Sequence, residues 1–340
     1  MIIRDFNTES RILIVAEIGN NHEGSFEIAR QLVIKAAECG VDAVKFQTFR
    51  TEHYVSKSDE ARFSRLKSFE LSFAQFAQLS NLAKELGLLF ISTPFDLASA
   101  EFLEHIVDAY KIASGDNNFY PLLEVVARTG KPVIISTGVS DFEQVAKTIS
   151  FVTRQWNDRK LKGQLALLHC VSSYPVAPGQ ANLRSMQCLA ENFDHTIGYS
   201  DHTLGLDAAL LAVALGARII EKHFTLDHNF SGFRDHQLSA DPKEMLELVQ
   251  RIRNASAMLG KFEKVVQPDE TGVVANIRRS IVAAKDLRQG HALAVGDLTW
   301  TRPAGGLPPG EEDRLIGRKL KHDFQFGEKI LATDVEAAAA

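Results

Sequence analysis

The 340-residue sequence predicts a (β/α)8 barrel (TIM barrel) followed by a small β-rich domain. Short runs rich in Val, Ile and Leu alternate with amphipathic patterns over the first 260 residues, as in parallel sheets with helical crossovers. Eight such runs occur, which favours a closed barrel over the alternative of an open doubly wound sheet. The length also suffices for a barrel of roughly 250 residues with a small appended domain.

The eight predicted strands end in polar residues. The strands cover residues 12–19, 41–47, 88–94, 109–115, 132–138, 166–172, 195–200 and 217–224, and the helices predicted between them include 26–40, 72–87 and 241–259. The carboxyl ends of barrel strands all face one mouth, where barrel enzymes have their active sites. We therefore expect these polar ends to converge.

The pattern changes near residue 260, where the predicted catalytic barrel (1–260) ends. Residues 261–278 are polar and irregular, which predicts a linker. Residues 279–336 carry short strand patterns with Gly-marked turns and one short helix, which predicts a compact β-rich domain. The final alanines, 337–340, are predicted to be disordered or an artificial addition.

Composition excludes several classes of protein. A net charge of −5 gives no reason to expect nucleic acid or an anionic membrane surface as partner. No apolar run reaches the roughly 18 residues of a membrane span, and the first residues lack the apolar core of a signal peptide. Cys39, Cys170 and Cys188 form no CxxC pair and are predicted to be reduced. We expect a cytoplasmic protein.

Two histidines follow neighbouring predicted strands. His202 and His223 lie 21 positions apart, with an apolar helical pattern between them. A strand–helix–strand unit places both imidazoles at the same edge of the sheet, where they suit a divalent metal such as Mn, Zn or Fe. The alternative is two unrelated polar residues that form ordinary hydrogen bonds.

Lysines and a carboxylate occupy equivalent places on other strands. Lys45 and Lys111 lie within apolar runs, and with nearby hydroxyls they suit a phosphate or a phosphate-plus-carboxylate ligand. The alternative for each lysine is a solvated surface charge. Glu17 suits binding of sugar hydroxyls, orientation of water or base catalysis, or serves as an internal partner for Lys45. No Walker A loop or GxGxxG motif indicates a nucleotide.

The motifs have a familiar order. AEIGNNHEG, KFQT, ISTPFD, YKIASGD, IISTG, LLHCVSSYP, IGYSDHT and EKHFTLD resemble the sialic acid (N-acetylneuraminate) synthase family. RRSIVAAKDLRQG, LTWTRPAGGLPP and LIGRKLKHDFQFGEKI resemble that family's small antifreeze-like (SAF) domain. The resemblance covers the chain from about residue 10 to residue 335.

The resemblance implies a reaction and roles for individual residues. The family condenses phosphoenolpyruvate with an N-acylated hexose such as N-acetylmannosamine, giving a nine-carbon 2-keto acid and phosphate. It implies that His202 and His223 hold Mn²⁺, with Mg²⁺ or Co²⁺ as alternatives, and that Glu17 is catalytic with them. The residues implied to bind phosphoenolpyruvate are Lys45, Thr93, Lys111, Ser114, Ser136 and Ser200; those implied to bind the sugar are Gln47, Tyr174, Asp235 and Arg302.

The resemblance also implies a domain-swapped homodimer, in which the SAF domain of one chain covers the barrel mouth of the other. Arg302 is then the residue that reaches the N-acyl group of the sugar.

Two positions depart from the family pattern. The loop HNFSGFRDHQLSADP stands where many relatives have Pro-Gly-Pro-Asp, and Ser172 stands where they often have Asn. Legionaminate, pseudaminate and sialic acid 9-phosphate synthases share most of the motifs, so the acceptor stays open. The alternative functions are a metal-dependent aldolase or hydrolase and a non-enzymatic binding protein.

Overall fold

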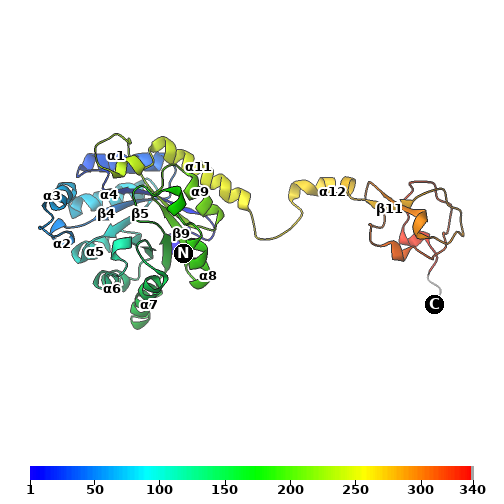
Figure 1. Ribbon diagram of the computed structural model, residues 1–340, viewed down its shortest axis with the longest axis horizontal. Helices are drawn as coiled ribbons and strands as arrows, with labels where there is room; N and C mark the ends of the chain where they lie inside the picture. Colours follow the sequence, from blue (N-terminus) through cyan, green and yellow to red (C-terminus); the bar gives the residue numbers. More distant parts are fainter. Residues whose placement is uncertain (338–340) are drawn as a thin grey trace. The chain divides into compact units, whose positions relative to one another are not determined.

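The computed structural model describes residues 1–337, and its trace divides into two compact units, residues 1–260 and the chain from Lys261 onward (Figure 1). The predicted disordered tail lies, apart from residue 337, outside the described residues. Within residues 1–337 no helix is both long and apolar enough to cross a membrane.

The first unit is a closed barrel of eight parallel strands, so the predicted (β/α)8 architecture is confirmed. The strands are β3 (Leu13–Gly19), β4 (Ala43–Thr48), β5 (Leu89–Pro94), β6 (Ala109–Ile112), β7 (Val133–Ser136), β8 (Leu165–His169), β9 (Thr196–Asp201) and β10 (Ile219–His223). Each pairs with the next along the chain, and β10 pairs with β3 to close the ring. Every predicted strand overlaps one of these eight.

Helices surround the barrel (Figure 1). They are α1 (Phe26–Glu38), α4 (Phe73–Glu85), α5 (Leu97–Leu103), α6 (Tyr120–Arg128), α7 (Phe142–Asp158), α8 (Ser185–Asn192), α9 (Asp207–Ala214) and α11 (Pro242–Leu259), with the additional helices α2 (Thr51–Tyr54), α3 (Glu60–Phe69) and α10 (Asp235–Leu238) in the connections after β4 and β10. Local sequence fixes where several begin. Ser72 and Gln75 form a capping box at α4, and Asp241 and Glu244 form another at α11.

An apolar cluster fills the lower half of the barrel. Leu13, Ala43, Leu89 and Ile219 line it near the amino ends of their strands, and the amino-terminal hairpin packs against it. The hairpin consists of β1 (Ile2–Ile3) and β2 (Phe6–Asn7), and Ile3 is fully buried. This hairpin closes the base of the barrel and was not predicted from the sequence.

The second unit has its own small core. Its strands β11 (Ser280–Ala283) and β12 (Leu298–Thr301) pair antiparallel, and Ile281, Leu315 and Ile330 are completely buried. Much of the rest is irregular, with 3₁₀ turns at 295–297, 312–314 and 332–334. The described residues 279–336 contain no α-helix, and these 3₁₀ turns are the helical elements of this domain. A helix, α12 (Thr271–Ile277), lies instead in the segment predicted to be an irregular linker.

Candidate active site

A cavity of about 530 Å³ opens at the carboxyl ends of the barrel strands, a size typical of small-molecule sites. The predicted site residues that line it are Glu17, Lys45, Gln47, Thr93, Lys111, Ser114, Ser136, Tyr174, Ser200, His202, His223 and Asp235. Arg302 does not belong to this group, because it lies in the second unit, exposed, directly after β12. Its predicted contact with the sugar stays a prediction.

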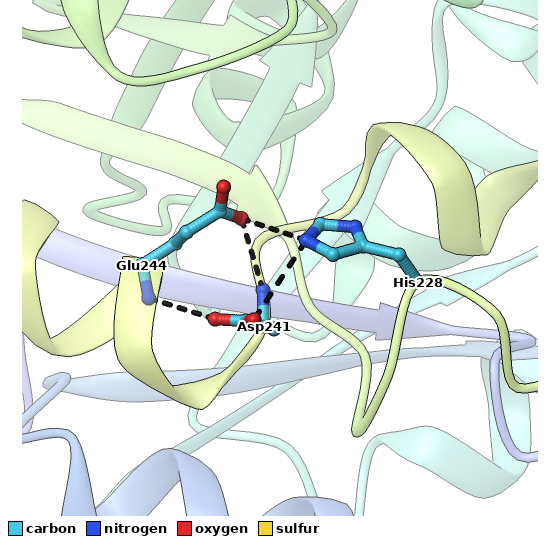
Figure 2. Close-up of side chains that lie close together, drawn as sticks. All are labelled: His228, Asp241 and Glu244. Carbon is cyan, nitrogen blue, oxygen red and sulfur yellow. Dashed lines mark hydrogen bonds and ion pairs between the residues drawn. The ribbon is translucent and has the colours of Figure 1, made fainter.

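One group of side chains that could hold a metal ion lies outside the cavity, where the loop after β10 meets the start of α11 (Figure 2). Possible ligand atoms of His228, Asp241 and Glu244 come within 4.8 Å of one another. Asp241 Oδ1 accepts a hydrogen bond from the Glu244 amide at 2.8 Å, and Glu244 Oε2 accepts one from the Asp241 amide at 3.3 Å. His228 Nε2 lies 3.2 Å from Glu244 Oε2. The two carboxylates cap α11, so this group is explained by helix capping.

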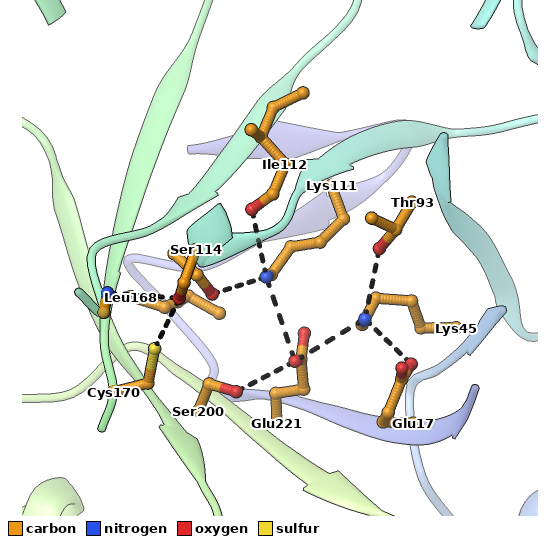
Figure 3. Close-up of polar contacts among 12 residues, drawn as sticks. Glu17, Lys45, Thr93, Lys111, Ile112, Ser114, Leu168, Cys170, Ser200 and Glu221 are labelled. Carbon is orange, nitrogen blue, oxygen red and sulfur yellow. Dashed lines mark hydrogen bonds and ion pairs between the residues drawn. The ribbon is translucent and has the colours of Figure 1, made fainter. Parts of the chain in front are cut away.

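Buried charged side chains from several barrel strands form ion pairs at the cavity (Figure 3). Lys45 Nζ lies 2.8 Å from Glu17 Oε2 and 3.6 Å from Glu221 Oε1, and it donates a hydrogen bond to Thr93 Oγ1 at 3.2 Å. All four side chains are buried. The predicted pairing of Glu17 with Lys45 is thus present, and Lys45 is no solvated surface charge.

Glu221 connects the two lysines. Its Oε1 lies 3.9 Å from Lys111 Nζ and accepts a hydrogen bond from Ser200 Oγ at 2.9 Å. Lys111 Nζ donates a hydrogen bond to Ser136 Oγ at 2.5 Å. Sequence reasoning noted Glu221 only as a polar strand end and gave it no role. The strand period of two was the available signal, because counting back two positions from His223 puts Glu221 on the same face.

The two carboxyl groups have different electrostatic surroundings. Burial raises the pKa of Glu17, even with the Lys45 ammonium beside it. Burial also acts to raise the pKa of Glu221, but Lys111 and Lys45 outweigh it and lower this pKa. Burial lowers the pKa of Lys111, whereas at Lys45 the two carboxylates outweigh burial and raise the pKa. Glu17 is therefore the carboxyl group suited to exchange a proton, and Glu221 is the permanent anion.

A close turn after β7 forms a small polar cradle. The Gly138 amide donates a hydrogen bond to Ser114 Oγ at 3.1 Å, and Cys170 Sγ lies 3.1 Å from the same hydroxyl. A Cβ at position 138 would lie 2.6 Å from Ser172 Oγ and 2.7 Å from Ser114 Oγ. Only glycine lets the hydroxyls approach this backbone. Hydroxyl groups gathered beside the Lys111 ammonium suit phosphate oxygens.

The two predicted metal-ligating histidines lie together. Their ring centroids are 5.5 Å apart, and the Tyr174 ring lies 4.3 Å from that of His202. His202 Nδ1 donates to the Val171 carbonyl at 2.8 Å, which leaves the lone pair on Nε2. His223 Nδ1 is buried without a hydrogen-bond partner. The two rings come from strands that pair with each other, as the spacing predicts.

Both imidazoles are held neutral. Burial lowers the pKa of His223 to about 3 and also lowers that of His202. Neutral imidazole is the ligating form, and an unpartnered buried nitrogen is unusual without a ligand. These residues therefore fit a divalent metal such as Mn²⁺. Two protein ligands would leave coordination positions for a substrate.

Gln47, one of the predicted sugar-binding residues, contacts Glu17 at the cavity wall. β3 has a bulge between Glu17 and Gly19, where Gly19 adopts a φ of 53°. Gln47 Nε2 donates to Glu17 Oε1 at 3.2 Å, and Gln47 Oε1 accepts from Asn20 Nδ2 at 2.8 Å. A Cβ on residue 19 would lie 3.0 Å from Glu17 Oε1. The bulge thus gives room for the Glu17–Gln47 contact.

The rim contains further residues to which sequence analysis gave no role. Arg234 lies 5.2 Å from the Tyr174 ring and 3.8 Å from Asp235 Oδ1. Tyr54 and Arg62 also line the cavity; they come from α2 and α3, an insertion between β4 and α4 that the strand–helix pattern does not predict.

Three other histidines have structural contacts. His22 Nδ1 accepts a hydrogen bond from the Gly24 amide, and His169 Nε2 donates to the Ala181 carbonyl. His236 contacts Thr225 and Glu23. None of these three lines the cavity.

Comparison with known proteins gives the family. The NeuB family model matches residues 32–264, and the SAF domain model matches residues 278–336. The chain is 40% identical over 338 residues to N,N'-diacetyllegionaminic acid synthase of Legionella pneumophila, covering 95% of this chain and 94% of the relative. It is 32% identical over 339 residues to N-acetylneuraminate-9-phosphate synthase of Mus musculus, covering 95% and 92%.

A solved structure agrees with these matches. The N-acetylneuraminic acid synthetase of Leptospira borgpetersenii, crystallised with citrate, superimposes with a TM-score of 0.72 at 35% identity, covering 77% of this chain and 90% of that one. Family models, full-length relatives and fold therefore agree. The chain belongs to the NeuB family, the sialic acid synthases, and carries that family's C-terminal SAF domain.

Proposed function

We propose that this enzyme condenses phosphoenolpyruvate with an N-acylated hexose, with N-acetylmannosamine as the first candidate, to give a nine-carbon 2-keto acid and phosphate. One observation carries the proposal: two buried lysines, both near Glu221, line the same cavity as two neutral imidazoles. A trianionic enol phosphate needs such cations, and an aldehyde needs an electrophilic partner.

The anion end of phosphoenolpyruvate binds beside Lys45 and Lys111. The hydroxyls of Thr93, Ser114, Ser136 and Ser200 supply hydrogen-bond donors there. Glu221 already balances part of the lysine charge, so it keeps both ammonium groups in place before the substrate arrives. Such preorganisation reduces the reorganisation that the reaction requires.

The bond-forming step joins C3 of phosphoenolpyruvate to the aldehyde carbon of the sugar. Water then adds at C2, and the tetrahedral intermediate expels phosphate as its C–O bond breaks. Glu17 accepts the proton of the attacking water, because burial raises its pKa and its carboxylate lies at the cavity wall. Gln47 orients this carboxylate.

His202 and His223 would hold Mn²⁺, with Mg²⁺ or Co²⁺ as alternatives, and the bound ion would polarise the aldehyde as a Lewis acid. The Tyr174 ring packs beside both imidazoles, with ring centroids 4.3 Å from His202 and 6.0 Å from His223. Asp235, at the rim next to His223, contacts the sugar hydroxyls.

The alternative products are legionaminate, pseudaminate and sialic acid 9-phosphate. The Legionella relative makes a diacetylated product, according to its name, and shares more identity with this chain than the murine relative does. A hexose with two acetamido groups is therefore the second acceptor to test.

A homodimer with exchanged SAF domains would complete the site. Arg302 would approach the N-acyl group of a sugar bound in the partner barrel. The helix α12 supports this arrangement, because Val273 and Ile277 are exposed apolar side chains on the segment that joins the units.

The test incubates metal-stripped protein with phosphoenolpyruvate, Mn²⁺ and each acceptor, and follows the 2-keto acid by mass spectrometry. We expect product and phosphate in equal amounts, dependent on both substrates. Phosphate release without an acceptor would indicate a hydrolase, and cleavage or formation of a 2-keto acid from free pyruvate would indicate an aldolase. The His223→Ala variant should be inactive yet folded, as judged by circular dichroism.

A further inference from the structure

A second buried ion pair lies directly behind the two cavity histidines. Lys222 Nζ lies 2.9 Å from Asp201 Oδ2, and the side chains are 2% and 0% exposed. The two residues are register partners on β9 and β10. Each is the chain neighbour of a histidine, Asp201 of His202 and Lys222 of His223. The pair therefore connects the two strand ends that carry the imidazoles.

The pair also fixes the chain just beyond His202. Asp201 Oδ1 accepts hydrogen bonds from the amide and the hydroxyl of Thr203, at 2.9 and 2.8 Å. Lys222 Nζ donates to the Thr203 carbonyl at 2.5 Å. Residue 203 is thus held at both of its backbone polar groups, so His202 sits between two anchored residues.

Stability alone gives a poor account of this pair. A buried ion pair often contributes nothing beyond what well-packed apolar side chains of similar size would contribute. Its geometric effect is different, because charge-assisted hydrogen bonds fix distance and direction. Ligand-bearing residues typically depend on such outer contacts for orientation.

We propose that Asp201 and Lys222 are positioning residues that set the separation of the His202 and His223 rings. The proposal rests on the proposed function insofar as the rings hold a metal there. The ring geometry itself is independent of that function. Loss of the pair frees the chain at residues 202–203 and lets the rings separate, while the barrel stays closed through its backbone ladder.

The test variant is the double substitution Asp201→Leu and Lys222→Met, which removes the acceptor of the Thr203 amide together with both charges and leaves no buried charge unpaired. The matched control is Asp42→Asn. Asp42 is also buried, pairs with Arg253 at 2.6 Å and binds the Ile14 amide, but it precedes β4 at the amino end of the barrel. Both proteins are compared with wild type in the full-length chain.

Two measurements decide the proposal. Manganese titration followed by electron paramagnetic resonance should show a dissociation constant about 10–100-fold higher in the double variant, and one close to wild type in Asp42→Asn. Crystal structures should show the imidazole centroids displaced from their 5.5 Å separation only in the double variant.

The outcomes separate the two hypotheses. Equal manganese binding by wild type and His223→Ala would remove the proposed metal role, and the crystal structures would still decide the positioning role. Unchanged ring positions in a double variant of native melting temperature would overturn the positioning proposal. A loss of affinity of the same size in Asp42→Asn would also overturn it, because it would show a general effect of barrel stability.

Discussion

At the scale of single residues, the site depends on groups held in charge states that water would not favour. Burial keeps His223 neutral far below the pH at which imidazole normally takes up a proton. Burial outweighs the single neighbouring lysine and raises the pKa of Glu17, whereas Lys111 and Lys45 together outweigh burial and lower the pKa of Glu221. These shifts follow from burial and neighbouring charge, which only the folded chain creates.

The His223 pKa has a consequence for stability. Between about pH 6.5 and about pH 3 the unfolded chain binds a proton at this residue and the folded chain does not. The free energy of unfolding therefore falls with decreasing pH in this window, by up to about 1.4 kcal/mol per pH unit from this group. In His223→Gln this contribution disappears, so urea denaturation of metal-free protein should give a shallower pH dependence. His105→Gln, at an exposed position, is the control. Parallel curves for wild type and His223→Gln would contradict the buried neutral state.

The cradle at Gly138 gives a second test with single residues. Gly138→Ala displaces the Ser114 and Ser172 hydroxyls, since its Cβ would lie within 2.7 Å of both oxygens. We expect the KM for phosphoenolpyruvate to rise on the order of 10-fold, the effect of about one lost hydrogen bond, with the sugar KM unchanged. Gly179→Ala is the control, because a Cβ there meets nothing within 4 Å and the residue does not line the cavity. Equal effects of the two substitutions in steady-state kinetics would rule out the cradle.

At the scale of elements, sequence periodicity was sufficient to predict the barrel strands but predicted poorly the segments that connect them. Runs of β-branched residues mark β3 and β10 because a strand covered by helices must be apolar on both faces. The hairpin β1–β2 escaped because each strand has only two residues, too few for any period. The helices α2 and α3 were not predicted, because they are an insertion between one strand and its following helix, and the strand–helix alternation does not indicate such insertions.

The same distinction applies to the site. A polar residue at a strand end was a reliable guide to the cavity, since all strand ends of a barrel meet there. Contacts such as Lys222 with Asp201 were out of reach, because the sequence gives two charged neighbours without showing that both face away from solvent.

The capping group at α11 can be separated from a metal site. Asp241→Ala removes the acceptor for the Glu244 amide, which should lower the free energy of unfolding by about 1 kcal/mol. Asp241→Asn retains a capping oxygen and should remain near wild type. Manganese affinity should be unchanged in both variants. A weakened affinity in either would make His228 and its neighbours ligands after all (Figure 2).

At the scale of the whole molecule, the chain consists of a barrel and a small domain with its own core. Mixing inactive variants tests whether the two act across a dimer. If Arg302 acts in the partner barrel, Arg302→Ala and His223→Ala subunits that exchange freely in equal amounts should recover about one quarter of wild-type activity, because half of the dimers then contain one intact site of two. Recovery of none, with exchange verified by mass spectrometry, would show that Arg302 acts within its own chain or has no role.

The amino-terminal hairpin makes the two ends of the barrel unequal. Ile3 and the apolar cluster around Leu13 and Ile219 fill the base. Small molecules therefore reach the cavity of the described barrel only through its mouth. In the proposed reaction, both substrates would enter and both products would leave through this one opening. An inhibitor that binds at the rim would therefore keep bound substrate inside the cavity as well as exclude further substrate. Wash-out experiments with labelled phosphoenolpyruvate would detect this effect as label that stays with the protein.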